Sequence, residues 1–431
     1  MQLTARQLGR LLHSAAFASL VGVYLGAVLQ FILRLYVARQ LGPVSFGDVA
    51  LALVVINLVA HLAMVGFNHG LPRLVGQYRA QADASRILGA VRFALMITCA
   101  AAAAAAVVGV AVVLGLGHER PERLTTLVLA LAVVPLLAVF HLLIHAARSF
   151  QRMWLARLPY NVVLPTLVIA VVLGADAAGR LSAPWVIGAY GLLSLPLLLD
   201  VARRLRREPA LKHARDTGHA TYEPRAWLAL GLPNLAFTGC NQMLRRMDVL
   251  FVALLASDEA LGVYALAFNF ALVVTLAVQA ANAYVSSSLA EAYTRGDNQR
   301  LRREARATAR LALGLCAGLA LLLALVGQPV FAYFGPGFEP GYMLLMILLV
   351  GILGEAWFAP GVNLLQMADR ERLAAKLLAV LMLLSAVGYI VLLPLYGVMA
   401  AAGVAAGARL TLAYLAHRAC RRQLNCSAAA L

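Results

Sequence analysis

Charged side chains are scarce in this sequence. Asp, Glu, Lys and Arg make up 13% of its 431 residues and hydrophobic residues make up 62%, whereas a soluble domain contains about 25% charged residues. The mean hydropathy is +0.83. This composition excludes an ordinary soluble domain and predicts an integral membrane protein.

Cysteine is also rare, and its five positions show neither metal-ligand spacing nor an even number. They are Cys99, Cys240, Cys316, Cys420 and Cys426. His141 and His145 are one helical turn apart, but no Glu joins them in an HExxH motif. The sequence also has no Walker loop for ATP. We therefore expect no disulfide framework, no metal site, no cofactor and no enzymatic activity.

Twelve apolar segments are long enough to cross a bilayer, since a hydrocarbon core of about 30 Å requires about 20 residues per helix. The first six are 13–37, 46–68, 90–116, 124–146, 159–175 and 183–201. The other six are 226–256, 261–285, 308–332, 341–366, 373–395 and 399–416. The predicted fold class is therefore an all-α integral membrane protein with twelve transmembrane helices.

Basic residues outnumber acidic residues, with 36 Lys and Arg against 19 Asp and Glu. This excess is also typical of nucleic-acid-binding proteins, so the positions of the basic residues must distinguish the two classes of protein. If the N-terminus is cytoplasmic, 25 of the 36 basic residues lie in cytoplasmic segments, seven lie inside spans and four lie in the opposite loops. The positive-inside rule therefore predicts a multi-pass protein of the bacterial inner membrane with both termini in the cytoplasm. It also explains the basic charge without a nucleic-acid partner.

The second half of the sequence weakly repeats the first half. Shifts of 215 and 218 residues align short segments of the two halves. The pairs are 35–38 (LYVA) with 250–253 (LFVA), 47–52 (GDVALA) with 262–267 (GVYALA), and 152–156 (RMWLA) with 370–374 (RERLA). Because each half holds six spans, both halves enter the membrane in the same direction. The sequence thus predicts parallel repeats, an arrangement typical of transporters with a substrate site between two lobes.

These repeats define the predicted domains. They are an N-terminal six-helix lobe at 1–201, a basic cytoplasmic linker at 202–225, a C-terminal six-helix lobe at 226–420 and a short cytoplasmic tail at 421–431. No predicted loop on the non-cytoplasmic side is longer than about ten residues. We therefore expect no extramembrane domain.

Polar side chains inside the spans indicate a hydrophilic cavity. Each buried charge costs about 2.5–3.5 kcal/mol on insertion scales, so such groups tend to face the protein interior or a wet cavity. In the span 226–256, polar residues recur every three or four positions, which places them on one helix face. They are Asn234, Thr238, Asn241, Arg245 and Asp248. The alternative is that Arg245 or Arg246 pairs with Asp248 and only fixes the helix to a neighbour.

The residues that we expect to line the cavity are Gln30, Arg34, Asn57, His61, Asn241, Gln242, Arg245, Arg246, Asp248 and Glu355. Within this set, His61 also fits the simpler interpretation of a hydrogen-bonded packing residue. Arg92 and Arg409 are expected to reach the cytoplasmic surface or to pair locally. A groove with Arg34, Arg245 and Arg246 would suit a diphosphate.

An ordered series of loose motifs covers nearly the whole chain. They are 39–47 (RQLGPVSFG), Gly66-Phe67 to Arg73, 246–250 (RMDVL), 262–267 (GVYALA), Pro360 to Gln366 before Arg370, and 394–398 (PLYGV). In order and spacing, these motifs resemble those of the polysaccharide-export flippases. That family belongs to the superfamily that also contains lipid II flippases and multidrug and toxin extrusion pumps.

The resemblance implies two lobes around a cavity, alternating access, and a polyprenyl-diphosphate-linked oligosaccharide as cargo. It implies flipping of this glycan lipid from the cytoplasmic to the outer leaflet for surface polysaccharide assembly. Membrane lipid, glycan polymerases and glycosyltransferases are the expected partners. Arg34 falls where lipid II flippases have an arginine in the first span, which implies contact with the diphosphate.

Two other interpretations stay open. The first is a cation-coupled multidrug exporter of the same fold, in which Asp248 and Glu355 bind protons or sodium. The second is an inactive scaffold of a glycan-assembly complex, for which substitutions in the cavity would have no effect.

Overall fold

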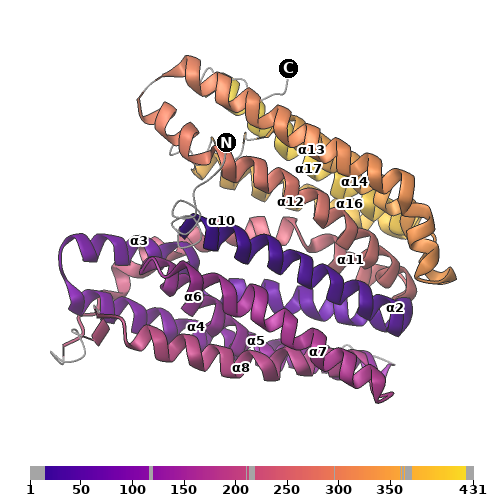
Figure 1. Cartoon of the computed structure of the whole chain (residues 1–431), viewed down its shortest axis with the longest axis horizontal. Coiled ribbons are helices and arrows are strands. Elements are labelled where there is room, and N and C mark those ends of the chain that lie inside the picture. Colours follow the sequence, from indigo (N-terminus) through magenta and orange to yellow (C-terminus); the bar gives the residue numbers. More distant parts are fainter. Residues whose placement is uncertain are drawn as a thin grey trace, which may run out of the picture. The chain divides into compact units, whose positions relative to one another are not determined.

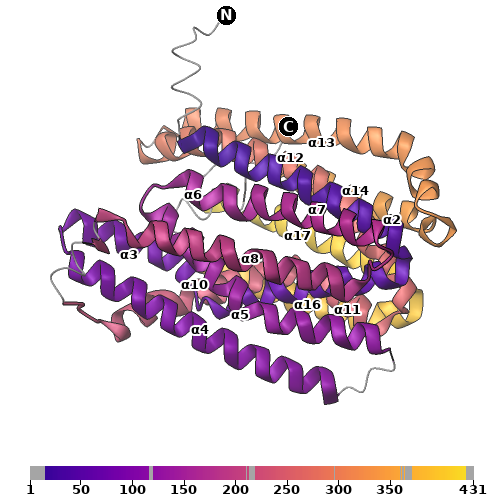
Figure 2. The same cartoon turned by 60° about the horizontal axis from the view of Figure 1, so that its bottom comes forward.

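The structure is a computed structural model that describes residues 15–115, 120–209, 211–212, 219–295, 297–359, 361, 364 and 371–423. Every regular element within these residues is a helix, as Figures 1 and 2 show. The chain divides into two compact units. The first unit comprises Met1–Leu41 and Asp48–Gly239, and the second comprises Gly42–Gly47 and Cys240–Leu431.

The first unit is built around helix α5, which packs against α3, α4 and α8. Its helices are α2 (Ala15–Ala63), α3 (Phe67–Ala80), α4 (Ala84–Gly115), α5 (Pro121–Ser149), α6 (Met153–Leu158), the π-helix η1 (Pro159–Val163), α7 (Leu164–Ala177), α8 (Ala183–Arg206) and the first part of α10 (Pro224–Leu244). Leu137, Ala138 and Phe140 of α5 are completely buried. Burial of this apolar helix face provides the core of the unit.

The second unit is built in the same way around α14, which packs against α12, α13 and α17. Its helices are the end of α10, α11 (Met247–Leu255), α12 (Asp258–Thr294), α13 (Asn298–Tyr333), the 3₁₀-helix η2 (Pro336–Phe338), α14 (Gly341–Trp357), α16 (Glu371–Tyr396) and α17 (Val398–Gln423). Small residues let α14 and α17 approach closely, because a Cβ on Gly351 would lie 2.5 Å from the Cα of Ala406. Close contact through small residues is typical of helices packed in a membrane.

The prediction of an all-α membrane fold with twelve helices is confirmed. By length and composition, nine of the described helical stretches could cross a membrane, and α14 is a shorter apolar helix. The first of these stretches holds two predicted spans, because α2 bends at Gly42, which has φ 71° and ψ 177°. The pair α10 and α11 occupies the predicted span 226–256. Glycine tolerates the positive φ that this bend requires.

The helix order of the first unit recurs in the second. α5 packs against α4 and α8, and α14 packs against α13 and α17. The bend at Gly42 and the break between α11 and α12 at Ser257 are 215 positions apart. This is one of the two shifts that align the sequence, so the recurrence agrees with the predicted duplication.

The division between the units falls inside α10, after Gly239. The start of α10 belongs to the first unit because Trp227 is completely buried there and donates a 2.9 Å hydrogen bond from Nε1 to the Tyr78 hydroxyl. The lobe boundaries that the sequence suggested, with a linker at 202–225, stay a prediction.

Gly262 tests the packing of the second unit. A Cβ at this position would lie 1.8 Å from the carbonyl oxygen of Pro43. We expect Gly262→Ala to destabilise the protein by about 1–3 kcal/mol, as overpacking does, and to lower the midpoint of thermal unfolding in detergent. Gly314→Ala is the matched control, because nothing lies within 4 Å of that Cβ position. Equal midpoints for the two variants would contradict this description of the packing.

Candidate functional site

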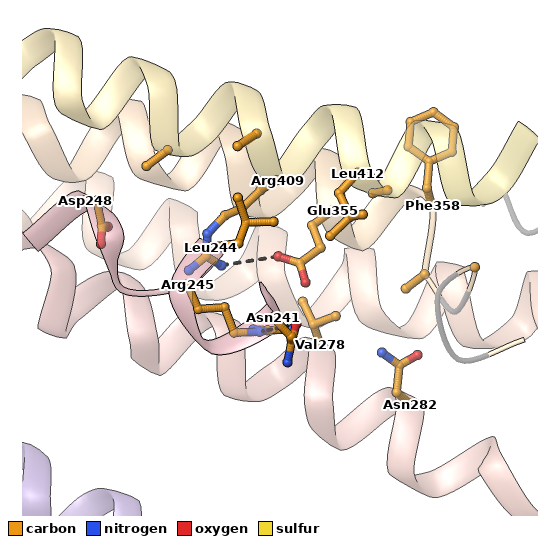
Figure 3. A pocket seen from close by; sticks show the side chains of 15 residues that line it. Asn241, Leu244, Arg245, Asp248, Val278, Asn282, Glu355, Phe358, Arg409 and Leu412 are labelled. Atoms are coloured by element: carbon orange, nitrogen blue, oxygen red, sulfur yellow. Dashed lines mark hydrogen bonds and ion pairs between the residues drawn. The ribbon is translucent and has the colours of Figure 1, made fainter. Parts of the chain in front are cut away.

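A polar cavity of about 120 Å³ lies inside the second unit, among residues of α10, α11, α12, α14 and α17 (Figure 3). Its polar lining residues are Asn241, Arg245, Asp248, Asn282, Glu355 and Arg409. Most of the other lining residues are apolar, among them Leu244, Val278 and Leu412. Four residues predicted from the sequence, Asn241, Arg245, Asp248 and Glu355, are thus brought together around one space.

The cavity lies where the helix predicted over 226–256 is interrupted. α10 ends at Leu244 and α11 begins at Met247, so Arg245 and Arg246 form the break. The interruption leaves backbone N–H groups at the start of α11 without helical partners, and these carry partial positive charge. The expectation of one continuous helix with a single polar stripe over 226–256 is therefore wrong. Instead, the broken helix places Arg245 at a bend beside the cavity (Figure 3).

Within the cavity, Glu355 forms an ion pair with Arg409. Arg409 Nη1 donates to Glu355 Oε2 at 3.2 Å and to Thr275 Oγ1 at 3.3 Å. The two charged side chains are 18% and 24% exposed, so the pair is largely withdrawn from solvent. The sequence left open whether Arg409 reaches the cytoplasmic surface or pairs locally. In the structure it pairs, with Glu355 of helix α14. The sequence analysis did not include Arg409 in the cavity.

Both carboxylate oxygens of Asp248 accept hydrogen bonds. Its side chain is 3% exposed, and its Oδ2 accepts a 2.9 Å hydrogen bond from the Tyr264 hydroxyl. Its Oδ1 accepts a 2.9 Å hydrogen bond from the Val249 N–H. This carboxylate lies in the first turn of α11, where the helix dipole favours a negative charge.

The Arg245 guanidinium bonds to a neutral side chain rather than to a carboxylate. Its Nε donates to Asn241 Oδ1 at 3.3 Å, and its side chain is exposed towards the cavity. No ion pair joins Arg245 to a carboxylate among the residues that the structure describes. Within the cavity, this guanidinium is the cationic group most available to an incoming anion.

The other predicted site residues do not line this cavity. Gln242 and Arg246 are half-buried, and Arg246 Cζ lies 5.7 Å from the ring centroid of Phe268. Gln30, Arg34, Asn57 and His61 belong to the first unit.

Asn57 and His61 in α2 bond to the backbone of their own helix. Asn57 Nδ2 donates to the carbonyl of Leu53 at 2.7 Å, and His61 Nδ1 lies 2.7 Å from the carbonyl of Asn57. These bonds satisfy one polar atom of each side chain without a ligand.

The first unit holds an aromatic cluster that the sequence did not reveal. The ring centroid of His141 lies 5.0 Å from that of His61 and 4.6 Å from that of Tyr160. Tyr160 lies in η1, and π-helical turns are frequent at functional sites. His141 is 6% exposed, and its Nδ1 has no hydrogen-bond partner in the described structure. No group of three or more potential metal ligands is present among the described residues.

The pair of Glu355 and Arg409 is open to a double-mutant cycle. We expect Glu355→Gln to destabilise the protein by about 1–3 kcal/mol, because it leaves the largely buried Arg409 without its counter-charge. In Glu355→Gln/Arg409→Gln, part of this loss should be recovered, which corresponds to a coupling of about 1 kcal/mol or more. The measurement is thermal unfolding of the four proteins in detergent. Strict additivity of the two single substitutions would show that the pair contributes nothing.

Comparison with known proteins places the chain in a family. Residues 36–334 match the family described as Polysaccharide biosynthesis protein. No curated protein matches the sequence. This family match confirms the resemblance that the sequence motifs indicated.

Several solved structures share the fold. An inward-facing multidrug resistance MATE family transporter of the MOP superfamily has a TM-score of 0.80 and 14% identity, over 96% of this chain and 98% of that chain. The lipid II flippase MurJ in an inward closed conformation has a TM-score of 0.68 and 11% identity, over 93% and 87%. A MOP superfamily transporter from Pyrococcus furiosus has a TM-score of 0.67 and 15% identity, over 98% and 99%.

At these identities the structural likeness establishes the fold alone. The family match, in contrast, covers more than half of the chain. This multi-pass membrane protein therefore belongs to the polysaccharide biosynthesis protein family and has the fold of the MOP superfamily transporters.

Proposed function

We propose that this protein flips a polyprenyl-diphosphate-linked oligosaccharide from the cytoplasmic to the outer leaflet of the bacterial inner membrane. Transport proceeds by alternating access and serves surface polysaccharide assembly, without enzymatic chemistry. Family membership and the flippase MurJ among the structural neighbours support this class of cargo. Glycosyltransferases and a glycan polymerase are the proposed partners, and both termini are proposed to be cytoplasmic.

The observation that carries the proposal is the position of Arg245. It lies at the break between α10 and α11, beside the cavity, and its partner is the neutral Asn241. A guanidinium can bind phosphate oxygens in a bidentate manner. Half-helix ends near the middle of a membrane bind anionic substrate groups in other transporters. Both features suit the diphosphate of a glycan lipid.

The head of such a lipid needs polar partners throughout its passage, since each unpaired polar group in hydrocarbon costs several kcal/mol. Asn241 is one such partner, and Asn282 is another because its buried Oδ1 has no hydrogen-bond partner among the described residues. The cavity volume of about 120 Å³ suits part of a head group rather than a whole oligosaccharide. Cargo contacts of Gln242 and Arg246 in the second unit, and of Gln30, Arg34, Asn57 and His61 in the first unit, stay predictions.

A cation-coupled multidrug exporter is the second candidate, because Asp248 and Glu355 lie around the same cavity. A cation would have to displace Arg409 from Glu355, and Tyr264 from Asp248. These existing bonds favour an anionic cargo. Susceptibility to cationic dyes separates the candidates, since loss of an exporter sensitises cells to dyes whereas loss of a flippase removes surface glycan.

Substitution of Arg245 tests the cargo site. We expect Arg34→Ala and Arg245→Ala each to abolish polysaccharide export while protein level and thermal unfolding stay near those of the native protein. Arg180→Ala is the matched control, because Arg180 is exposed and follows the end of α7. The measurements are surface glycan per cell and membrane-embedded protein per cell. Native export in both the Arg34→Ala and the Arg245→Ala variants would contradict the proposal.

The membrane potential provides a second test. A membrane potential that is negative inside favours the outward movement of negative charge by about 2.3 kcal/mol per charge per 100 mV. We therefore expect an imposed inside-negative potential to accelerate outward flipping of a diphosphate-linked glycan lipid in proteoliposomes. If the flipping rate is independent of both the size and the sign of the potential, the diphosphate charge does not cross the membrane without a counter-ion, and this version of the mechanism is refuted.

A further inference from the structure

The first part of α13 has one strongly basic face. Residues at steps of three or four positions are exposed along it, beginning with Gln299, Arg303, Arg306 and Arg310. On the other face, Leu301 is 2% exposed and Ala305 and Ala309 are completely buried. α13 is therefore held to its unit by one side and presents its arginines outward.

Three arginines in this part of α13 have no counter-charge among the described residues. Arg302, Arg303 and Arg306 form no ion pair with any residue that the structure describes, whereas the nearby Arg300 reaches Glu291 at 3.4 Å. Glu304 points to a different side of the helix, as the 3.6-residue period requires. Arg302, Arg303 and Arg306 consequently concentrate positive charge that no carboxylate of the described residues pairs with.

The arginines border a hollow rather than a flat surface. The residues that line it all belong to α13, and they are Gln299, Arg302, Arg303, Arg306, Ala307 and Arg310. Ala307 has the shortest side chain of the six, so the arginines surround a gap over that position. A single phosphate group in this gap could receive donors from more than one guanidinium.

The same helix face continues as an exposed apolar surface within a helix that is long and apolar enough to cross a membrane. Further along the three-or-four-residue steps, Leu321 and Leu325 are 62% and 72% exposed. The 36 residues of α13 extend about 54 Å at 1.5 Å per residue. That length exceeds a hydrocarbon core of about 30 Å and also the full bilayer of about 40–45 Å. With its leucines in the core, the basic end of α13 reaches the depth of the headgroups.

We propose that this basic face of α13 is a binding site for the phosphate headgroup of an anionic phospholipid such as phosphatidylglycerol. A lipid is the source of the phosphate because the arginines lie on the face whose next turns contact acyl chains. The site is separate from the cavity that contains Arg245, since the two share no lining residue.

The test is a lipid titration of the purified full-length protein in detergent. Binding is followed by the rise in the midpoint of thermal unfolding with dioleoyl phosphatidylglycerol, with dioleoyl phosphatidylcholine and with inorganic phosphate. We expect stabilisation by phosphatidylglycerol alone. In Arg302→Gln/Arg303→Gln/Arg306→Gln, the apparent affinity for phosphatidylglycerol should fall on the order of tenfold or more, because each basic residue near a membrane surface contributes to such attraction.

The matched control is Arg203→Gln/Arg206→Gln/Arg207→Gln, which removes the same charge from exposed positions at the end of α8. Near-native affinity in the control supports a site on α13. Equal losses in both variants would reveal non-specific attraction and overturn the proposal. Equal protection by inorganic phosphate would overturn the lipid assignment. If the triple variant is unfolded in the absence of lipid, the single variant Arg306→Gln takes its place in the titration. A weaker affinity of that variant for phosphatidylglycerol supports the site, and a native affinity contradicts it.

Discussion

A charge inside an apolar helix must find its partner within the protein, because hydrocarbon offers none. Both units of this structure obey that constraint with carboxylates that bond to arginines of another segment of the chain. In the first unit, Asp48 is completely buried and accepts from Arg120 at 2.7 Å. In the second, Glu355 accepts from Arg409 at 3.2 Å. Arg245 is held by a neutral amide instead, and its available charge is the feature on which the proposed transport of an anionic lipid depends.

The sequence was sufficient to predict the fold because membrane-spanning helices are encoded locally. Each span needs a run of apolar residues, and hydropathy records that run without knowledge of tertiary structure. The repeat could also be predicted, since the bend at Gly42 and the break at Ser257 lie at the shift that aligns the two halves. Four of the predicted site residues line one cavity because they lie at the break of one span or on a helix packed nearby.

Other parts of the site left no signal in the sequence. Arginine is a good helix former, so propensity gave no reason to break the helix at Arg245. The partner of Glu355 is 54 positions away, on a helix that lies beside α14 only after folding. Asn57 bonds to its own backbone, which periodicity cannot distinguish from a side chain that faces a ligand. The contact between His141 and Tyr160 depends on the packing of α5 against the chain around η1. The pair of Glu355 and Arg409 and the contact of His141 with Tyr160 are tertiary contacts, which no local pattern encodes.

Within the cavity, Arg409 thus pairs with the carboxylate of Glu355, whereas Arg245 is available to the cargo. The most direct measurement is an experimental structure of the protein with a bound polyprenyl-diphosphate lipid. The account predicts diphosphate oxygens within hydrogen-bond distance of the Arg245 guanidinium, with the pair of Glu355 and Arg409 intact. A diphosphate bound away from Arg245, or a cation coordinated by Asp248 and Glu355 in its place, would contradict it.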